Sequence, residues 1–268
     1  MSVDGAGSTA GGARERLSPT GVLRAVGRRL RAAPARCVPF TVAGVVVALA
    51  DWLRLRDPLP VAQPAWVGDT VSVQYALFPS GTARTSRHLG AFLDLRLPYL
   101  VGGLTLEAVV ALAVGTAGWL TITRSLSADR TAASFGRYVA GLGAMLAFGG
   151  LLPVRDVELA SLPLALLAAA VLALVAVRLF LLPGLLAAGS GVTTALVRSV
   201  RLSRGTGATL FWLVLVFGLV SWALAIVPVV GGFLSTAVVG TVHAVALAVV
   251  LGHLDDEAGA SGERPGRP

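Results

Sequence analysis

The chain has little of what a soluble domain or a disulfide-bonded secreted protein needs. Only 13% of its 268 residues are charged, against about a quarter in a typical soluble domain. Its single cysteine, Cys37, excludes an intramolecular disulfide and any metal site built from several cysteines. Lysine is absent, so all 22 basic residues are arginines. We interpret this bias, together with the abundance of alanine, valine, leucine and glycine, as typical of a GC-rich prokaryotic genome.

Apolar residues, by contrast, make up 55% of the chain and give a mean hydropathy of +0.80. They form long runs without the short alternation of soluble strands or helices, which is typical of membrane spans of about 20 residues. We therefore predict an all-α integral membrane bundle of six transmembrane helices with amphipathic helices at the interface. The bundle would occupy residues 18–254, between disordered tails at 1–17 and 255–268. The predicted spans are Cys37–Leu53, Pro98–Ile122, Gly136–Leu152, Leu159–Leu182, Gly207–Val227 and Gly231–Leu251.

The arginines predict the orientation of these spans. With the N-terminus inside, fifteen arginines fall on the cytoplasmic side and six on the outer side. The positive-inside rule therefore places both termini in the cytoplasm of a plasma-membrane protein. Membrane topology also explains the net charge of +8 better than nucleic-acid binding does.

Two basic segments are predicted to lie along the cytoplasmic membrane surface. The first is a helix that begins at Ser18-Pro19, with Ser18 as its N-cap and with Leu23, Val26 and Leu30 on one face. The second is Val192–Arg204, with Val192, Leu196 and Val200 on one face. Arginines on such helices can bind anionic lipid headgroups, and a cytoplasmic protein partner is the alternative for the second segment. The candidate lipid contacts are Arg24, Arg28, Arg31, Arg178, Arg198, Arg201 and Arg204.

One predicted loop, residues 56–97, is long and faces outward. It contains a Phe78–Gly81 turn and a possible helix from Thr82 to Leu95. Long loops often carry function, but we favour a cap packed across the outer mouth of the bundle.

The region from Arg178 onward contains an unusual order of features. They are Arg178-Leu-Phe-x-x-Pro183, then Ala195-Leu-x-x-Ser199 leading to Arg204-Gly205, a span, the turn Ile226-Val-Pro228-x-x-Gly231 and a final span. This pattern resembles the membrane domain beside some glycerophosphodiester phosphodiesterases and the related YciC-like inner-membrane proteins. The resemblance implies an all-helical membrane protein with basic interfacial segments. It implies no activity, because the chemistry of that group belongs to a separate soluble domain.

Two ionisable residues fall well inside predicted spans, where such groups are candidates for function. Glu107 lies about 13 Å and His243 about 18 Å below the outer surface at 1.5 Å per residue. They would form a polar or proton-relaying site if their helices were neighbours. We favour the alternative, in which a protonated Glu107 bonds with a backbone carbonyl or a hydroxyl and His243 is packed. A third ionisable residue within a span, Arg178, lies about 28 Å from the outer surface and close to the inner face, so it is poorly placed to pair with Glu107. We favour an interface anchor over a substrate clamp for Arg178.

Little else points to chemistry. Gly189-Ser190-Gly191 with His243 weakly resembles an intramembrane serine protease, but the two residues lie at different depths. We therefore expect neither an enzyme nor a bound cofactor or metal. The leading hypothesis is a non-catalytic multi-pass protein that interacts with lipid, with another membrane protein or with a second copy of itself. The alternative is a small-molecule or ion transporter, or a permease-like component, that uses Glu107 and His243.

Small residues recur at four-residue spacing in two of the predicted spans. They would allow close packing within one subunit or homodimerisation. The two stripes are Gly136, Ala140 and Ala144, and Gly240, Ala244, Ala248 and Gly252.

Overall fold

The computed structural model describes residues 17–57, 59, 61, 76–85, 87, 95–151 and 162–262. Within these ranges every regular element is helical, and five helices are long and apolar enough to cross a membrane. The chain therefore has the architecture of a multi-pass helical membrane protein. Of the predicted N-terminal tail, only Leu17 is among the described residues.

The helices follow the predicted apolar runs closely. The elements are α1 (Pro19–Ala32), η1 (Pro34–Cys37), α2 (Val38–Arg56), α3 (Leu97–Leu126), α4 (Ala132–Leu151), α5 (Leu162–Leu179), α6 (Leu182–Ala187), α7 (Val192–Ala225), α8 (Gly231–Leu234), the π-helical η5 (Ser235–Gly240) and α9 (Thr241–Gly262). Helix α4 matches the third predicted span but is not among the five candidates for crossing. The polar Arg137 and Tyr138 in its second turn lower its hydropathy. At the C-terminus, α9 continues past residue 255, where the sequence predicted a tail.

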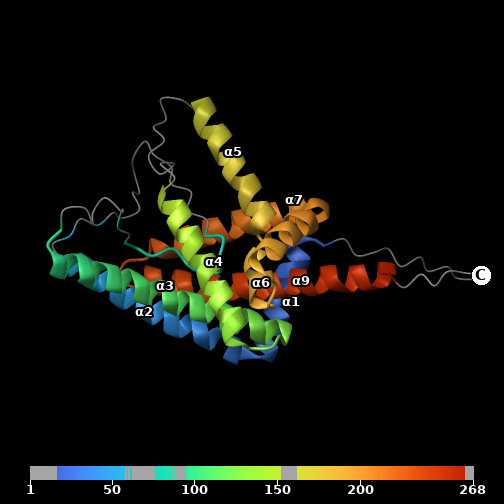
Figure 1. Cartoon of the computed structure of the whole chain (residues 1–268), viewed down its shortest axis with the longest axis horizontal. Coiled ribbons are helices and arrows are strands. Elements are labelled where there is room, and N and C mark those ends of the chain that lie inside the picture. Colours follow the sequence, from blue (N-terminus) through green and yellow to red (C-terminus); the bar gives the residue numbers. More distant parts are fainter. Residues whose placement is uncertain are drawn as a thin grey trace, which may run out of the picture.

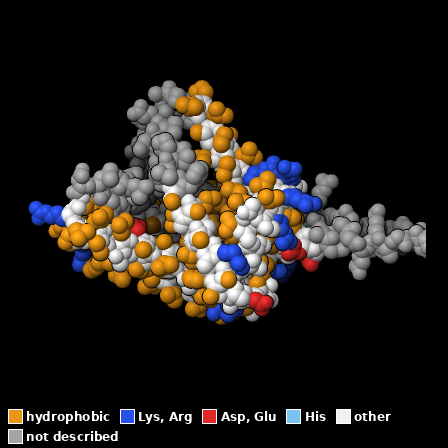
Figure 2. Space-filling model, viewed as in Figure 1, with side chains coloured by type: hydrophobic (Ala, Val, Ile, Leu, Met, Phe, Trp, Pro, Cys, Tyr) orange, Lys and Arg blue, Asp and Glu red, His pale blue; other side chains and the backbone are white. Residues whose placement is uncertain are grey.

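The centre of the bundle is the α8–η5–α9 segment. In its apolar window 72% of the residues are buried, against 11% for α3. It is packed against α1, α2, α3, α6 and α7, and Figure 1 shows α9 running through the middle of the long helices. Helix α5 points away from this group, and its contacts are mainly with α7. Apolar side chains cover its outward surface (Figure 2), as expected of a surface that faces lipid tails.

Helix α1 begins as predicted. The Ser18 hydroxyl accepts a hydrogen bond from the Gly21 backbone N–H at 3.1 Å, which confirms Ser18 as the N-cap. The helix buries Val22 and Val26 and is packed against α9 and α7. Its apolar stripe therefore covers one end of the bundle.

The second basic segment differs from the prediction. Residues 192–204 form the first turns of α7, which continues without a break to Ala225. The buried face of these turns consists of Ala195, Ser199 and Ser203, whereas Val192 and Leu196 are exposed. Small residues at four-residue spacing allow close helix packing. In these turns the face that permits close packing is buried, although it is less apolar than the face of Val192 and Leu196. No proline interrupts the sequence between Pro183 and Pro228, so nothing forces the helix to end.

The two small-residue stripes have different surroundings. Ala244 and Ala248 of α9 are fully buried, and Gly240, the last residue of η5, lies so close to the ring of Phe40 that an added Cβ would overlap it. In α4, Gly136, Ala140 and Ala144 are exposed. The α9 stripe therefore serves packing within the subunit, and the α4 stripe does not.

Candidate functional site

A buried arginine joins α2 to α3 near one end of the bundle. Arg54, in the last turn of α2, donates from Nε to Glu107 Oε1 at 2.9 Å and from Nη2 to Glu107 Oε2 at 2.7 Å. This two-bond geometry is the strong form of an arginine–carboxylate pair. The Arg54 side chain is 2% exposed and that of Glu107 is 35% exposed. The partner of Glu107 is therefore the Arg54 guanidinium, and not the backbone carbonyl or hydroxyl expected from the sequence.

A second carboxylate holds the other side of Arg54. Arg54 Nη1 donates to Asp51 Oδ1 at 3.3 Å and to the Thr85 carbonyl at 3.2 Å. Asp51 also accepts bonds from the Thr85 hydroxyl at 2.6 Å and from the backbone N–H groups of Arg84 and Thr85. Asp51 is 5% exposed. The result is a polar cluster that ties a non-helical segment to α2.

That non-helical segment is residues 76–85, which enter the helical bundle. Phe78 is buried with its ring 5.1 Å from that of Tyr138, in an edge-to-face contact. The Thr82 backbone N–H donates to the hydroxyls of Ser221 and Ser235, at 2.9 and 2.8 Å. Non-helical backbone is stable at membrane depth only where protein groups or water bond with it, and the Ser221 and Ser235 hydroxyls provide such bonds for Thr82.

The helix predicted from Thr82 is therefore wrong for residues 82–85, because Thr82 and Thr85 donate their backbone N–H groups to side chains of other elements. Residues 88–94 of that prediction lie outside the described ranges. Residues 78–85 of the loop are packed into the bundle, which goes further than the cap that the sequence suggested.

The structure gives His243 different neighbours from Glu107. His243 is 1% exposed and lies between Phe180 and Phe217, with ring centroids 5.3 and 5.0 Å away. It borders a cavity of about 10 Å³ that Thr82 and Ser221 also line. That volume holds about one water molecule. A shared path through Glu107 and His243 thus stays a prediction, and the cavity is too small for any larger solute.

Sequence reasoning missed the residues that build this cluster. Arg54 was counted only among the arginines of the outer side, and Asp51 fell within the first predicted span without being singled out. The available signal was the spacing Asp51-x-x-Arg54, which places opposite charges on one helix face. Depth could not match Glu107 to this pair, because Glu107 was expected about 13 Å below the outer surface and Arg54 follows the end of a predicted span. The Thr85 contribution had no such signal, because its partner is 34 residues away in the sequence.

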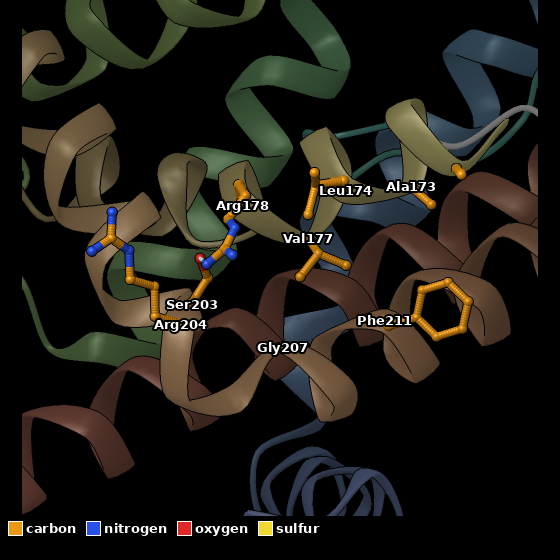
Figure 3. A pocket seen from close by; sticks show the side chains of 9 residues that line it. Ala173, Leu174, Val177, Arg178, Ser203, Arg204, Gly207 and Phe211 are labelled. Carbon is orange, nitrogen blue, oxygen red and sulfur yellow. Dashed lines mark hydrogen bonds between the residues drawn. The ribbon is translucent and has the colours of Figure 1, made fainter. Parts of the chain in front are cut away.

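A different kind of site lies between α5 and α7. A groove of about 370 Å³, open along one side, runs between the two helices. Its walls are apolar along most of their length, and Arg178, Ser203 and Arg204 lie together at one end (Figure 3). The other lining residues are Ala170, Ala173, Leu174, Val177, Gly207 and Phe211. The volume is within the usual range of small-molecule sites, about 300–1,000 Å³.

The candidate lipid contacts all lie toward the end of the bundle where α7 begins and α9 ends. Arg24, Arg28 and Arg31 are exposed on α1, as are Arg201 and Arg204 on α7, and Figure 2 shows arginines gathered around the start of α7. Arg198 differs, because it forms an exposed ion pair with Asp255 of α9 at 2.7 Å. Arg178 contacts the Ser203 hydroxyl at 3.5 Å.

The first of the residues that carried the family resemblance, those between Arg178 and Ser199, meet at the α5–α6–α7 corner. The Arg178 carbonyl accepts a bond from the Ser199 hydroxyl at 2.8 Å, and Phe180, Pro183 and Ala195 are buried. Gly189, at φ +95°, ends α6 in the left-handed conformation that glycine allows. No family model, no curated protein and no solved structure matches the chain, so the resemblance stays a prediction.

Proposed function

We propose that this chain is a non-catalytic multi-pass membrane protein that binds anionic lipid at the arginine-rich end of its bundle. The observation that carries the proposal is the pair Arg178 and Arg204 at the head of an apolar groove. Among the described residues, neither arginine forms an ion pair with a carboxylate. Cations beside lipid-facing apolar helices are attracted to anionic headgroups, at about 1 kcal/mol each.

The proposed topology has six spans, with both termini on the cytoplasmic side. Three contacts support it: α1 is packed against α9, the Leu17 carbonyl accepts a bond from Thr209 of α7, and Arg198 of α7 pairs with Asp255 of α9. The ion pair places the start of α7 beside the end of α9, and α1 is packed along the same two helices. This arrangement fits an even number of crossings between the start of α7 and the end of α9.

Cysteine labelling tests this topology in intact cells. In a Cys37→Ala background, a membrane-impermeant maleimide should react with Thr70→Cys but not with Ser8→Cys or Ser261→Cys. Labelling of only one terminus in intact cells would mean an odd number of spans.

Lipid selection tests the proposed function itself. Protein from nanodiscs of equal phosphatidylcholine and phosphatidylglycerol should retain mainly phosphatidylglycerol when released for native mass spectrometry. The enrichment should fall in 0.5 M salt, because salt screens exposed charges. Equal retention of the two lipids would contradict the proposal. The same spectra report subunit number, and so test the predicted homo-oligomer.

The transporter alternative receives less support. Glu107 is held by Arg54, and the cavity beside His243 holds about one water molecule. A transport path needs a wider wet passage than the described residues provide at these two positions.

A further inference from the structure

The groove between α5 and α7 combines a positively charged end with an apolar length. Arg178 offers five N–H donors, and its one described side-chain bond, to Ser203, is at the long limit for such bonds. Arg204 is exposed beside it (Figure 3). By contrast, Arg198, less than two turns earlier on α7, is neutralised by Asp255. Among the described residues, no carboxylate therefore neutralises Arg178 or Arg204, and both can bind an external anion.

The apolar walls of the groove indicate which kind of anion would fit it. From Arg178 to Ala170 the α5 wall is about 12 Å long at 1.5 Å per residue. One leaflet of the hydrocarbon core is about 15 Å deep. The groove thus extends from an interfacial cation through most of one leaflet. A free phosphate would leave these walls uncovered, whereas an acyl chain would cover them.

Resting on the lipid-binding function proposed above, we propose that this groove is a stoichiometric site for one anionic glycerophospholipid. The phosphate lies between the guanidinium groups of Arg178 and Arg204 and accepts a bond from the Ser203 hydroxyl. One acyl chain lies along α5 and α7, past Val177 and Gly207 to Phe211. The lipid covers apolar surface that α5 exposes because it points away from the bundle.

Gly207 allows a test that leaves both charges in place. It lines the groove, and a Cβ built on it would meet only Val177, at an ordinary contact distance of 4.0 Å. Gly207→Leu should therefore fill the groove without disturbing α7. Gly205 is the matched control, because it lies on the same helix, outside the groove lining, with nothing within 4 Å of an added Cβ.

The experiment is native mass spectrometry from the same mixed nanodiscs, with retained phosphatidylglycerol counted per subunit. Wild type and Gly205→Leu should each keep one tightly held molecule. Gly207→Leu should lose it. Arg178→Gln should weaken its retention about fivefold and the double variant with Arg204→Gln about 25-fold, from the expected contribution of each arginine. An excess of glycerol 3-phosphate should not displace it.

The outcomes separate this inference from the broader function. If wild type retains no excess phosphatidylglycerol, the proposed function fails. If wild type is enriched but Gly207→Leu and the arginine variants retain the same lipid, anionic lipid binds elsewhere and the groove proposal is overturned. Displacement by glycerol 3-phosphate would also overturn it, because the site would then bind a soluble phosphate. Circular dichroism of each variant checks that the helices remain folded.

Discussion

Arg54 and Arg178 both lie in the last turn of an apolar helix, yet their surroundings are opposite. Arg54 is 2% exposed and is held by two carboxylates, Asp51 and Glu107. Arg178 is half-buried at the head of an open groove, and among the described residues its side chain meets only a serine hydroxyl. The charge of Arg54 is thus paired within the protein, whereas that of Arg178 remains available to the membrane. We infer that the Arg54 cluster serves folding and that the Arg178 groove serves binding.

Arg54→Met should have the largest effect. Removing the cation leaves Asp51 and Glu107 without their shared partner, and loss of one member of a buried pair costs about 3–5 kcal/mol. The free energy of unfolding, measured by SDS titration in mixed micelles, should fall by that amount. The control is Arg56→Met, because the Arg56 guanidinium is exposed over the Trp52 ring at 3.8 Å and contributes about 0.5–1 kcal/mol. If the two variants lost the same free energy of unfolding, the Arg54 cluster would have no special role in folding.

Gly81→Ala should cause the second largest decrease in the free energy of unfolding. An added Cβ would overlap the backbone of Ser235 and Thr236, so the inserted segment must shift and strain its bonds to Ser221 and Ser235. Overpacking of this kind costs about 1–3 kcal/mol. Gly143→Ala is the control, since nothing lies near its Cβ position in α4 and alanine favours the helix. The same SDS titration should therefore shift in opposite directions for the two variants, and a neutral Gly81→Ala would mean that residues 76–85 are not tightly packed.

Arg178→Gln should have the smallest effect on stability. Its side chain makes one long hydrogen bond, so in lipid-free detergent the free energy of unfolding should change by less than about 1 kcal/mol. With phosphatidylglycerol added, wild type should gain stability that the variant lacks, because a ligand that binds the folded state stabilises it. A large decrease in the free energy of unfolding in lipid-free detergent would mean that Arg178 serves folding, as Arg54 does.

The positions of the helices could be predicted, because each apolar run is long enough to require a helix in lipid. The Ser18 N-cap was predicted for a local reason, a serine followed by proline. The continuity of α7 was not, because arginines inside an apolar run were taken to mark a membrane boundary. Arginine is a good helix former, so the backbone had no reason to stop at Arg204.

The polar contacts depend on which helices are neighbours, and hydropathy does not contain that information. Glu107 was identified as a candidate because a carboxyl group within a span is conspicuous. Its partner Arg54 was not identified, because an arginine at the end of a membrane helix is common. Part of the groove could be predicted from the sequence, which singled out Arg178 and Arg204 as lipid contacts. Its apolar walls could not, because they result from the angle between α5 and α7.

The inserted segment also constrains the order in which the chain can assemble. Thr82 bonds with Ser221 and Ser235, which follow it by 139 and 153 residues. During synthesis, residues 76–85 emerge long before the α7–α9 hairpin exists, so their backbone groups must remain bonded with water until that hairpin has entered the bilayer. Insertion of this segment is then the closing step of assembly, and a chain that stops before α7 leaves it outside the membrane.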